Sequence, residues 1–136
     1  MKLTRFEDLD CWKEARLLAN GVYKAINQNG SWRKDQRLCA QLQSASGSIM
    51  ANIAEGFTRR SNKEFVQFLF IAMSSAAEVQ SHLYIAVDQG YVSKQTFDLI
   101  YNQADKTSKI ISGLIKYLRA NQTKLTRLTR QTREIK

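Results

Sequence analysis

The chain has 136 residues, of which 43% are hydrophobic and 24% charged, and it contains no proline. A chain of this length fits one domain and buries about two thirds of the surface of its unfolded form, so it can fold without disulfides or metals. Its formal net charge of +9 favours polyanionic partners such as RNA or DNA over an acidic protein or an anionic membrane.

The positive charge is concentrated in the last third of the chain. Residues 1–90 carry 11 basic and 9 acidic side chains, a net charge of +2, whereas residues 91–136 carry 10 basic and 3 acidic ones, a net charge of +7. The sequence shows neither a secretory signal nor a membrane-spanning segment. Cys11 and Cys39 form no Cys-x-x-Cys pair. We therefore expect a cytoplasmic protein with reduced thiols and no membrane partner.

The first predicted helix covers about residues 9–27, with Asp8 as its N-cap. Apolar residues recur there at steps of three and four, which places them on one face. This face comprises Leu9, Trp12, Ala15, Ala19, Val22 and Ile26. Residues 28–31 predict a turn, because Asn29 or Gly30 can adopt the left-handed conformation after a helix.

The second predicted helix starts near Asp35 and ends between Ala54 and Phe57. Its apolar stripe comprises Leu38, Leu42, Ala45, Ile49 and Ile53. Residues 44–48 read Ser-Ala-Ser-Gly-Ser, and serine and glycine are mediocre helix formers. Their small side chains predict the close approach of a neighbouring helix.

The third predicted helix begins with a capping box, Ser61-Asn62-Lys63-Glu64, and ends near Gln89 because Gly90 follows. One apolar stripe comprises Phe65, Phe68, Leu69, Ala72, Ala76, Val79, Leu83 and Ala86. A second stripe comprises Val66, Phe70, Met73, Ala77 and Tyr84. Two stripes indicate burial on two sides, which favours an oligomer interface over a central position in a monomer.

The fourth predicted helix follows Ser93 as N-cap. Its apolar residues are Phe97, Ile100, Ala104, Ile111, Leu114 and Leu118. All predicted turns are short, so consecutive helices should be antiparallel neighbours. The sequence therefore predicts an all-α, antiparallel up-down-up-down four-helix bundle over residues 1–119. A basic C-terminal tail at residues 120–136 is either disordered or extends the fourth helix.

One segment resembles a known family. Residues 48–57 read Ser-Ile-Met-Ala-Asn-Ile-Ala-Glu-Gly-Phe and are followed by Arg59, Ser61 and Lys63-Glu64-Phe65. Together they are similar to the signature of the bacterial four helix bundle protein family, which includes proteins encoded by intervening sequences of 23S ribosomal RNA genes. Further similar segments lie at residues 6–9, 12–15, 74–80 and 90–93, so the resemblance covers residues 6–118. The family often has proline in the first turn and before the asparagine, and this chain has none.

The resemblance implies an antiparallel four-helix bundle that assembles as a ring, commonly a homopentamer. It also implies a similarity in fold to the accessory proteins of diversity-generating retroelements, which are basic pentamers that bind nucleic acid and a reverse transcriptase. A reverse transcriptase or a ribosome-associated protein is therefore a candidate partner. The family's older label, S23 ribosomal protein, is weak support for a role in the ribosome.

The residues do not predict an enzyme. His82, the only histidine, follows Glu78 by four positions, whereas di-iron bundles need two Glu-x-x-His motifs and two further glutamates. No phosphate-cradling glycine loop or nucleophile elbow is present. We therefore expect no catalytic residue, metal or cofactor.

Three polar residues lie on or beside the apolar stripes: Asn52, Glu55 and Glu78. Asn52 and Glu55 are three positions apart and so share a helix face. A buried carboxylate needs a partner, and Ser48, Ser74, Ser75 or an arginine could supply it. A structural polar network is favoured over a functional polar site.

Two basic clusters lie near predicted turns. Arg59, Arg60 and Lys63 stand where a helix start offers free N–H groups to a phosphate. Residues 33–37 contain Arg33, Lys34 and Arg37 beside Trp32, whose indole can stack on an unpaired base. Ordinary solvated charge is the alternative for both clusters.

The C-terminal segment repeats threonine and a basic residue in triplets. Its basic residues, together with those that end the fourth helix, are Lys116, Arg119, Lys124, Arg127, Arg130 and Arg133. Arginine density of this kind drives salt-dependent phosphate binding but carries no sequence information, and a merely solubilising tail is the alternative. The predicted function is a non-catalytic oligomer that binds nucleic acid, RNA in particular, through basic turns and this tail. The alternative is an adaptor whose main partner is another protein, such as a reverse transcriptase.

Overall fold

The computed structural model describes residues 4–121. Within this range the chain forms a 3-10 helix and five α-helices, and it forms no strand. The elements are η1 (Phe6–Asp8), α1 (Asp10–Asn27), α2 (Gly30–Lys34), α3 (Gln36–Phe57), α4 (Asn62–Asp88) and α5 (Lys94–Ala120). The predicted all-helical bundle is confirmed, whereas the short helix α2 was not predicted.

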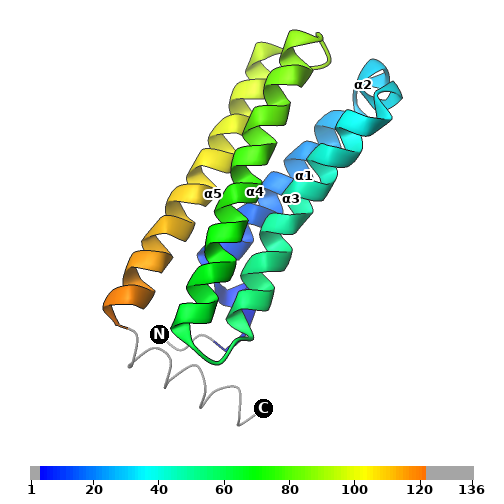
Figure 1. Cartoon of the computed structure of the whole chain (residues 1–136). Coiled ribbons are helices and arrows are strands. Elements are labelled where there is room, and N and C mark those ends of the chain that lie inside the picture. The colour runs from blue at the N-terminus through cyan, green and yellow to red at the C-terminus, as the bar shows by residue number, and fades with distance from the viewer. Residues whose placement is uncertain (1–3, 122–136) are drawn as a thin grey trace.

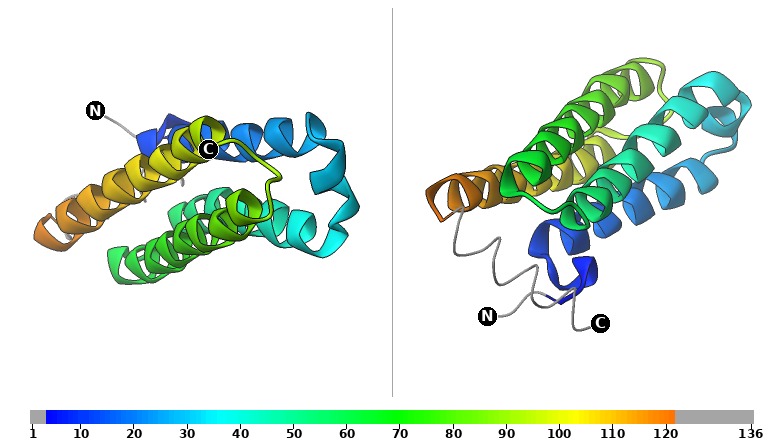
Figure 2. Two further views of the ribbon diagram at one scale, coloured as in Figure 1. Left: turned by 90° about the horizontal axis from the view of Figure 1, so that it is seen from above. Right: turned by 60° about the horizontal axis from the view of Figure 1, so that its bottom comes forward.

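The four long helices lie side by side in two layers (Figures 1 and 2). Helix α3 packs against α4, and α1 packs against α5; the layers meet because α1 also contacts α3 and α4 also contacts α5. We call the end that holds the α3–α4 loop and the end of α5 the lower end, as it appears in Figure 1. The upper end holds α2 and the α4–α5 loop.

The core consists of the apolar helix faces that the sequence predicted. The α3 stripe from Leu38 to Ile53 is buried throughout, and so is the first α4 stripe except for the half-buried Phe68. In α1 and α5 only Trp12 and Leu114 of the predicted residues are half-buried. The 3.6-residue period therefore located the core correctly.

Side-chain caps start three of the long helices. Asp35 accepts a hydrogen bond from the Leu38 amide at 3.1 Å, Ser61 from the Glu64 amide at 3.2 Å, and Ser93 from the Thr96 amide at 3.1 Å. Gly90 follows α4 with a φ of 75°, a left-handed conformation that glycine adopts without strain. The caps at Ser61 and Ser93 and the helix end before Gly90 agree with the sequence prediction, which gave Asp35 only as the approximate start of its helix.

The start of α1 differs from the prediction. Helix α1 begins at Asp10 after Leu9, which has no capping side chain. Asp8 instead closes η1, because its carboxylate accepts hydrogen bonds from the backbone amides of Thr4 and Arg5 at 3.3 and 3.2 Å. The predicted N-cap at Asp8 is therefore wrong by one residue.

Helix α2 changes the role of Trp32. The indole is fully buried and stacks on the Tyr91 ring, with 6.4 Å between the ring centroids and 16° between the planes. The Cys39 thiol donates to the Trp32 carbonyl at 3.0 Å. The prediction that Trp32 stacks on a base is therefore wrong, because α2 turns its ring into the upper end of the core.

Of the small residues 44–48 of α3, Ser48 lies at the close approach to α4 as expected, whereas Gly47 does not. Gly47 is exposed, and no atom lies within 4 Å of the position that a Cβ would take. The close approach between α3 and α4 occurs at Ser48, whose hydroxyl accepts from the Ser75 hydroxyl at 3.0 Å, and at Gly56. A Cβ at Gly56 would lie 2.8 Å from the Cβ of Phe68.

Candidate nucleic-acid interface

The lower end of the bundle brings together basic residues that are distant in the sequence. Arg59 and Arg60 lie in the α3–α4 loop, and Lys63 lies in the first turn of α4. The remaining two, Lys116 and Arg119, lie in the last turns of α5. The Asn62 side-chain amide donates to the Leu118 carbonyl at 3.4 Å, which joins the start of α4 to the end of α5. Figure 2 shows this end of the molecule turned forward.

Contacts with Glu55 and Phe68 help to hold Arg59 in place. Its guanidinium donates to the Glu55 carboxylate at 2.8 Å and lies over the Phe68 ring, 4.6 Å from the ring centroid. The pair with Glu55 is half exposed, with 40% of the Arg59 side chain accessible, so it contributes little to stability. Its main effect is to orient the guanidinium at the α3–α4 loop.

Arg119 makes a second guanidinium–aromatic contact at the lower end. Its guanidinium carbon lies 5.2 Å from the centroid of the Phe70 ring, which is 44% exposed. A guanidinium that contacts an aromatic ring keeps its N–H donors in its own plane, and donors that the ring does not cover can bond phosphate oxygens. The lower end therefore offers oriented arginines as well as the exposed Lys63 and Lys116.

The other predicted basic residues do not join this cluster. Arg33 and Lys34 of α2 and Arg37 at the start of α3 are exposed at the upper end, and Arg33 donates to the Asn27 carbonyl. Four predicted residues lie outside the described part of the chain: Lys124, Arg127, Arg130 and Arg133. The described chain ends at Asn121, at the lower end.

The predicted polar network exists around Asn52 but includes neither Glu55 nor Glu78. The Asn52 amide donates to the Ser48 carbonyl at 2.8 Å and to the Ser48 hydroxyl at 3.0 Å, and this hydroxyl also accepts from Ser75. Glu55 is exposed and pairs with Arg59 instead. Glu78 is exposed on α4 and lines an open groove of about 320 Å³ between α3 and α4. The network thus links α3 to α4 through uncharged groups.

Residues 4–121 contain no group of three or more histidine, cysteine, aspartate or glutamate side chains that could hold a metal ion. His82 lines the same groove as Glu78, and its Nδ1 atom is buried without a hydrogen-bond partner. Among the described helices, none is long and apolar enough to cross a membrane.

Both thiols are buried, and burial raises the pKa of Cys11 to about 12 and also raises the pKa of Cys39. The thiolate is the reactive species, so we expect both cysteines of the native protein to react slowly with a disulfide reagent at pH 8. For Cys11 the shift alone lowers the thiolate fraction about a thousandfold. The rates at which the thiols react in native buffer and in denaturant, followed by the absorbance of the product released from the reagent, would check this. Rapid release of two equivalents of the coloured product on addition of the reagent to native protein would contradict the prediction.

These features define a class of protein, a small helical bundle with one strongly basic end. The family can also be stated. A model described as 23S rRNA-intervening sequence protein matches residues 7–113, which is more than half of the chain, and the chain belongs to this family. The family resemblance seen in the sequence is thereby confirmed.

A solved structure shows the same fold. It is a protein with unknown function from the S23 ribosomal protein family of Bacteroides thetaiotaomicron, 22% identical to this chain, with a TM-score of 0.67. The match covers 78% of this chain and 98% of that one. At this identity the likeness shows the fold alone. No curated protein matches the chain significantly.

Proposed function

We propose that this protein is a non-catalytic homo-oligomer that binds nucleic acid, RNA in particular, through the basic lower end of each bundle. The observation that carries the proposal is that basic residues of the α3–α4 region and of α5 lie at the same end of the bundle. They are Arg59, Arg60, Lys63, Lys116 and Arg119. The Asn62–Leu118 hydrogen bond joins the two segments at this end. The link to 23S rRNA genes in the name of the family supports RNA over DNA. The proposal includes the up-down-up-down order of the four long helices and a ring of copies, a pentamer by the resemblance.

The proposed mechanism is electrostatic docking on backbone phosphates. Lysine and arginine side chains that neutralise phosphates release condensed counterions, so affinity falls as salt rises. Such contacts position a protein on nucleic acid but do not select a sequence. An oligomer presents several lower ends at once, and simultaneous engagement raises the overall affinity without any new contact.

The test compares two triple variants of equal charge. Replacing Lys63, Lys116 and Arg119 by alanine removes three positive charges from the lower end, whereas replacing Arg33, Lys34 and Arg37 removes three from the upper end. Binding of labelled RNA and DNA is measured by fluorescence anisotropy over a salt series. For single-stranded RNA, removing one lysine or arginine that neutralises a phosphate should reduce the slope of log affinity against log salt by about 0.7. We expect a reduction of about 2 for the lower-end variant and a much smaller one for the upper-end variant.

Equal reductions in the two variants would show that total charge, not the lower end, determines binding. Absence of binding by the wild-type chain even at low salt would overturn the nucleic-acid proposal and favour a protein partner. Tighter binding to DNA than to RNA would overturn the choice of RNA.

A further inference from the structure

The outer side of the α3/α4 layer exposes large apolar side chains of α4, two of which, Phe70 and Tyr84, also contact residues of α5 at the edge of the layer. Four large apolar side chains of α4 are between 44% and 51% exposed: Phe70, Ile71, Tyr84 and Ile85. Ser74, Ala77 and Ser81, which lie between them at helical spacing, are exposed as well. The neighbouring surface of α3 is formed by small exposed residues, among them Ala40, Ser44 and Ala51. Exposed apolar side chains that gather on one side of a protein indicate an interaction site.

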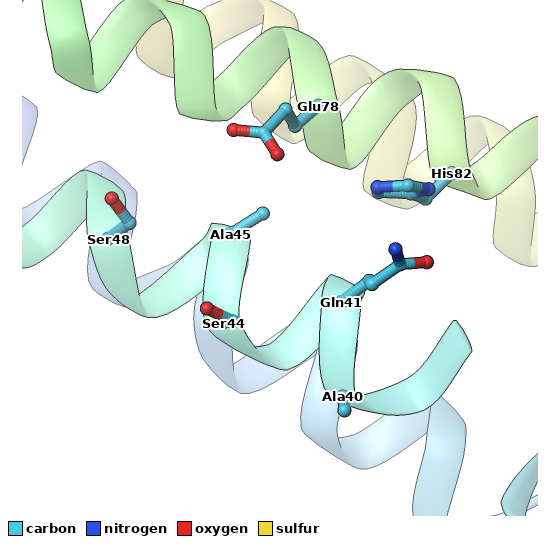
Figure 3. Close-up of a pocket in the computed structure, with 7 residues that line it drawn as sticks. All are labelled: Ala40, Gln41, Ser44, Ala45, Ser48, Glu78 and His82. Atoms are coloured by element: carbon cyan, nitrogen blue, oxygen red, sulfur yellow. The ribbon is translucent and has the colours of Figure 1, made fainter. Parts of the chain in front are cut away.

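A polar groove interrupts this surface. Figure 3 shows Glu78 and His82 extending from α4 toward α3, where Gln41, Ser44 and Ser48 line the opposite side. Among residues 4–121 no basic side chain pairs with Glu78, and His82 Nδ1 has no hydrogen-bond partner. The Ser48 hydroxyl accepts two hydrogen bonds. The groove therefore holds one carboxylate that no lysine or arginine of residues 4–121 pairs with, beside the polar groups of His82, Gln41 and two serines.

The two layers of the bundle carry opposite charge. Helices α3 and α4 contain two basic and four acidic residues, a net charge of −2, whereas α1 and α5 contain eight basic and four acidic residues, a net charge of +4. On α5, Lys94, Lys106 and Lys109 pair with acidic side chains of the same chain. The exposed basic residues of α1 have no ion pair with described residues: Lys13, Arg16 and Lys24. The α1/α5 layer also exposes Leu17 and Leu99, by 57% and 67%.

We propose that the α3/α4 layer of one chain docks onto the α1/α5 layer of a second copy, and that a basic side chain of α1 enters the groove and pairs with Glu78. The proposal rests on the homo-oligomeric part of the proposed function and names its contact surfaces. Covering the apolar surface removes water from Glu78, and a buried carboxylate without a cation is strongly unfavourable. Besides Lys116 and Arg119 at the lower end of α5, the exposed cations of the oppositely charged layer that lack ion pairs with residues 4–121 are Lys13, Arg16 and Lys24.

The charge of Glu78 also constrains the symmetry. A two-fold contact centred on the groove would bring two Glu78 carboxylates together, and like charges in a desolvated contact repel. Docking one layer on the other is instead a heterologous contact, which generates a closed ring if the rotation closes and a filament if it does not. The surface therefore fits a head-to-tail assembly of identical chains.

The experiment measures the molar mass of the full-length chain over a concentration series by light scattering and sedimentation equilibrium. We expect Glu78→Lys to weaken association about a hundredfold or more, because it places a cation against a basic layer. Glu64→Lys is the matched control, since it makes the same charge change at another exposed position of α4. Combining Glu78→Lys with Lys13→Glu, Arg16→Glu or Lys24→Glu should restore association in one of the three double variants. Circular dichroism would establish that every variant is folded.

Three outcomes would overturn the inference, and they differ in what else they affect. A wild-type chain that stays monomeric would remove the oligomer from the proposed function as well, while the RNA titrations would still decide nucleic-acid binding. An oligomer that Glu78→Lys leaves intact would remove only this contact. Dissociation by Glu78→Lys without rescue by any double variant would exclude α1 as the source of the cation.

Discussion

Replacing Trp32 by alanine is expected to lower the free energy of unfolding by about 3–5 kcal/mol. The indole is fully buried between α2 and the α4–α5 loop and stacks on Tyr91, so its removal reduces apolar burial and leaves a cavity. The indole N–H has no hydrogen-bond partner, which places the effect toward the lower part of that range. Urea unfolding followed by circular dichroism would measure it.

Two variants control this prediction. Trp32→Phe keeps most of the ring volume and removes the unpartnered N–H, so it should reduce stability by less than half as much. Trp12→Ala removes a half-buried indole that contacts Phe6 with 5.2 Å between ring centroids, and it should also cost less. If Trp32→Ala leaves stability unchanged and reduces RNA affinity, the indole stacks on bases and its assignment to the core is incorrect.

Two glycines of the same helix are expected to respond to alanine with opposite sign. Gly56→Ala should destabilise the protein by about 1–2 kcal/mol, because the overpacking cost of about 1–3 kcal/mol exceeds the gain in helix propensity. The new Cβ would lie 2.8 Å from Phe68 Cβ and 2.9 Å from Phe65 Cδ1, so α3 and α4 would have to separate. Gly47→Ala adds a Cβ with no atom within 4 Å and should stabilise the protein by about 0.5–1 kcal/mol.

Equilibrium unfolding of both glycine variants in one denaturant series gives the comparison directly. The matched pair separates packing from helix propensity, since both positions are in α3 and both gain one methyl group. Stabilisation by both substitutions would show that α3 and α4 adjust easily at Gly56. The close contact between α3 and α4 at Gly56 would then contribute nothing to the stability of the protein.

The sequence alone predicted most of the helical framework. The burial of Leu42, Ile49 and Ile53 and the caps at Ser61 and Ser93 all followed from spacing and residue type. These features are local: side chains three and four positions apart share a face, and a cap involves residues within one turn. The same local information favoured a second buried surface on α4, and Phe70 and Tyr84 of that stripe are exposed in the single chain.

Other features were decided only by the tertiary structure. The sequence placed Trp32 among basic residues and indicated a close helix contact at residues 44–48. The packing of α2 instead buries the indole, and α4 approaches α3 at Gly56 as well as at Ser48. Likewise, Glu55 and Glu78 were grouped by their place beside apolar stripes, although one pairs with Arg59 and the other lines the groove. Each of these outcomes depends on which neighbouring helix faces a residue, and periodicity within one helix does not contain that information.

The candidate interface shows the same division. Each basic segment of the lower end could be recognised in the sequence, because arginine and lysine beside a turn are exposed by default. The sequence could not predict that these segments lie close together. Lys63 and Arg119 come to one end of the bundle because α4 packs against α5 and Asn62 donates a hydrogen bond to the Leu118 carbonyl. The sequence by itself determined the helices and the sign of the charge. The tertiary structure decided where the charge gathers, since that depends on contacts between residues distant along the chain.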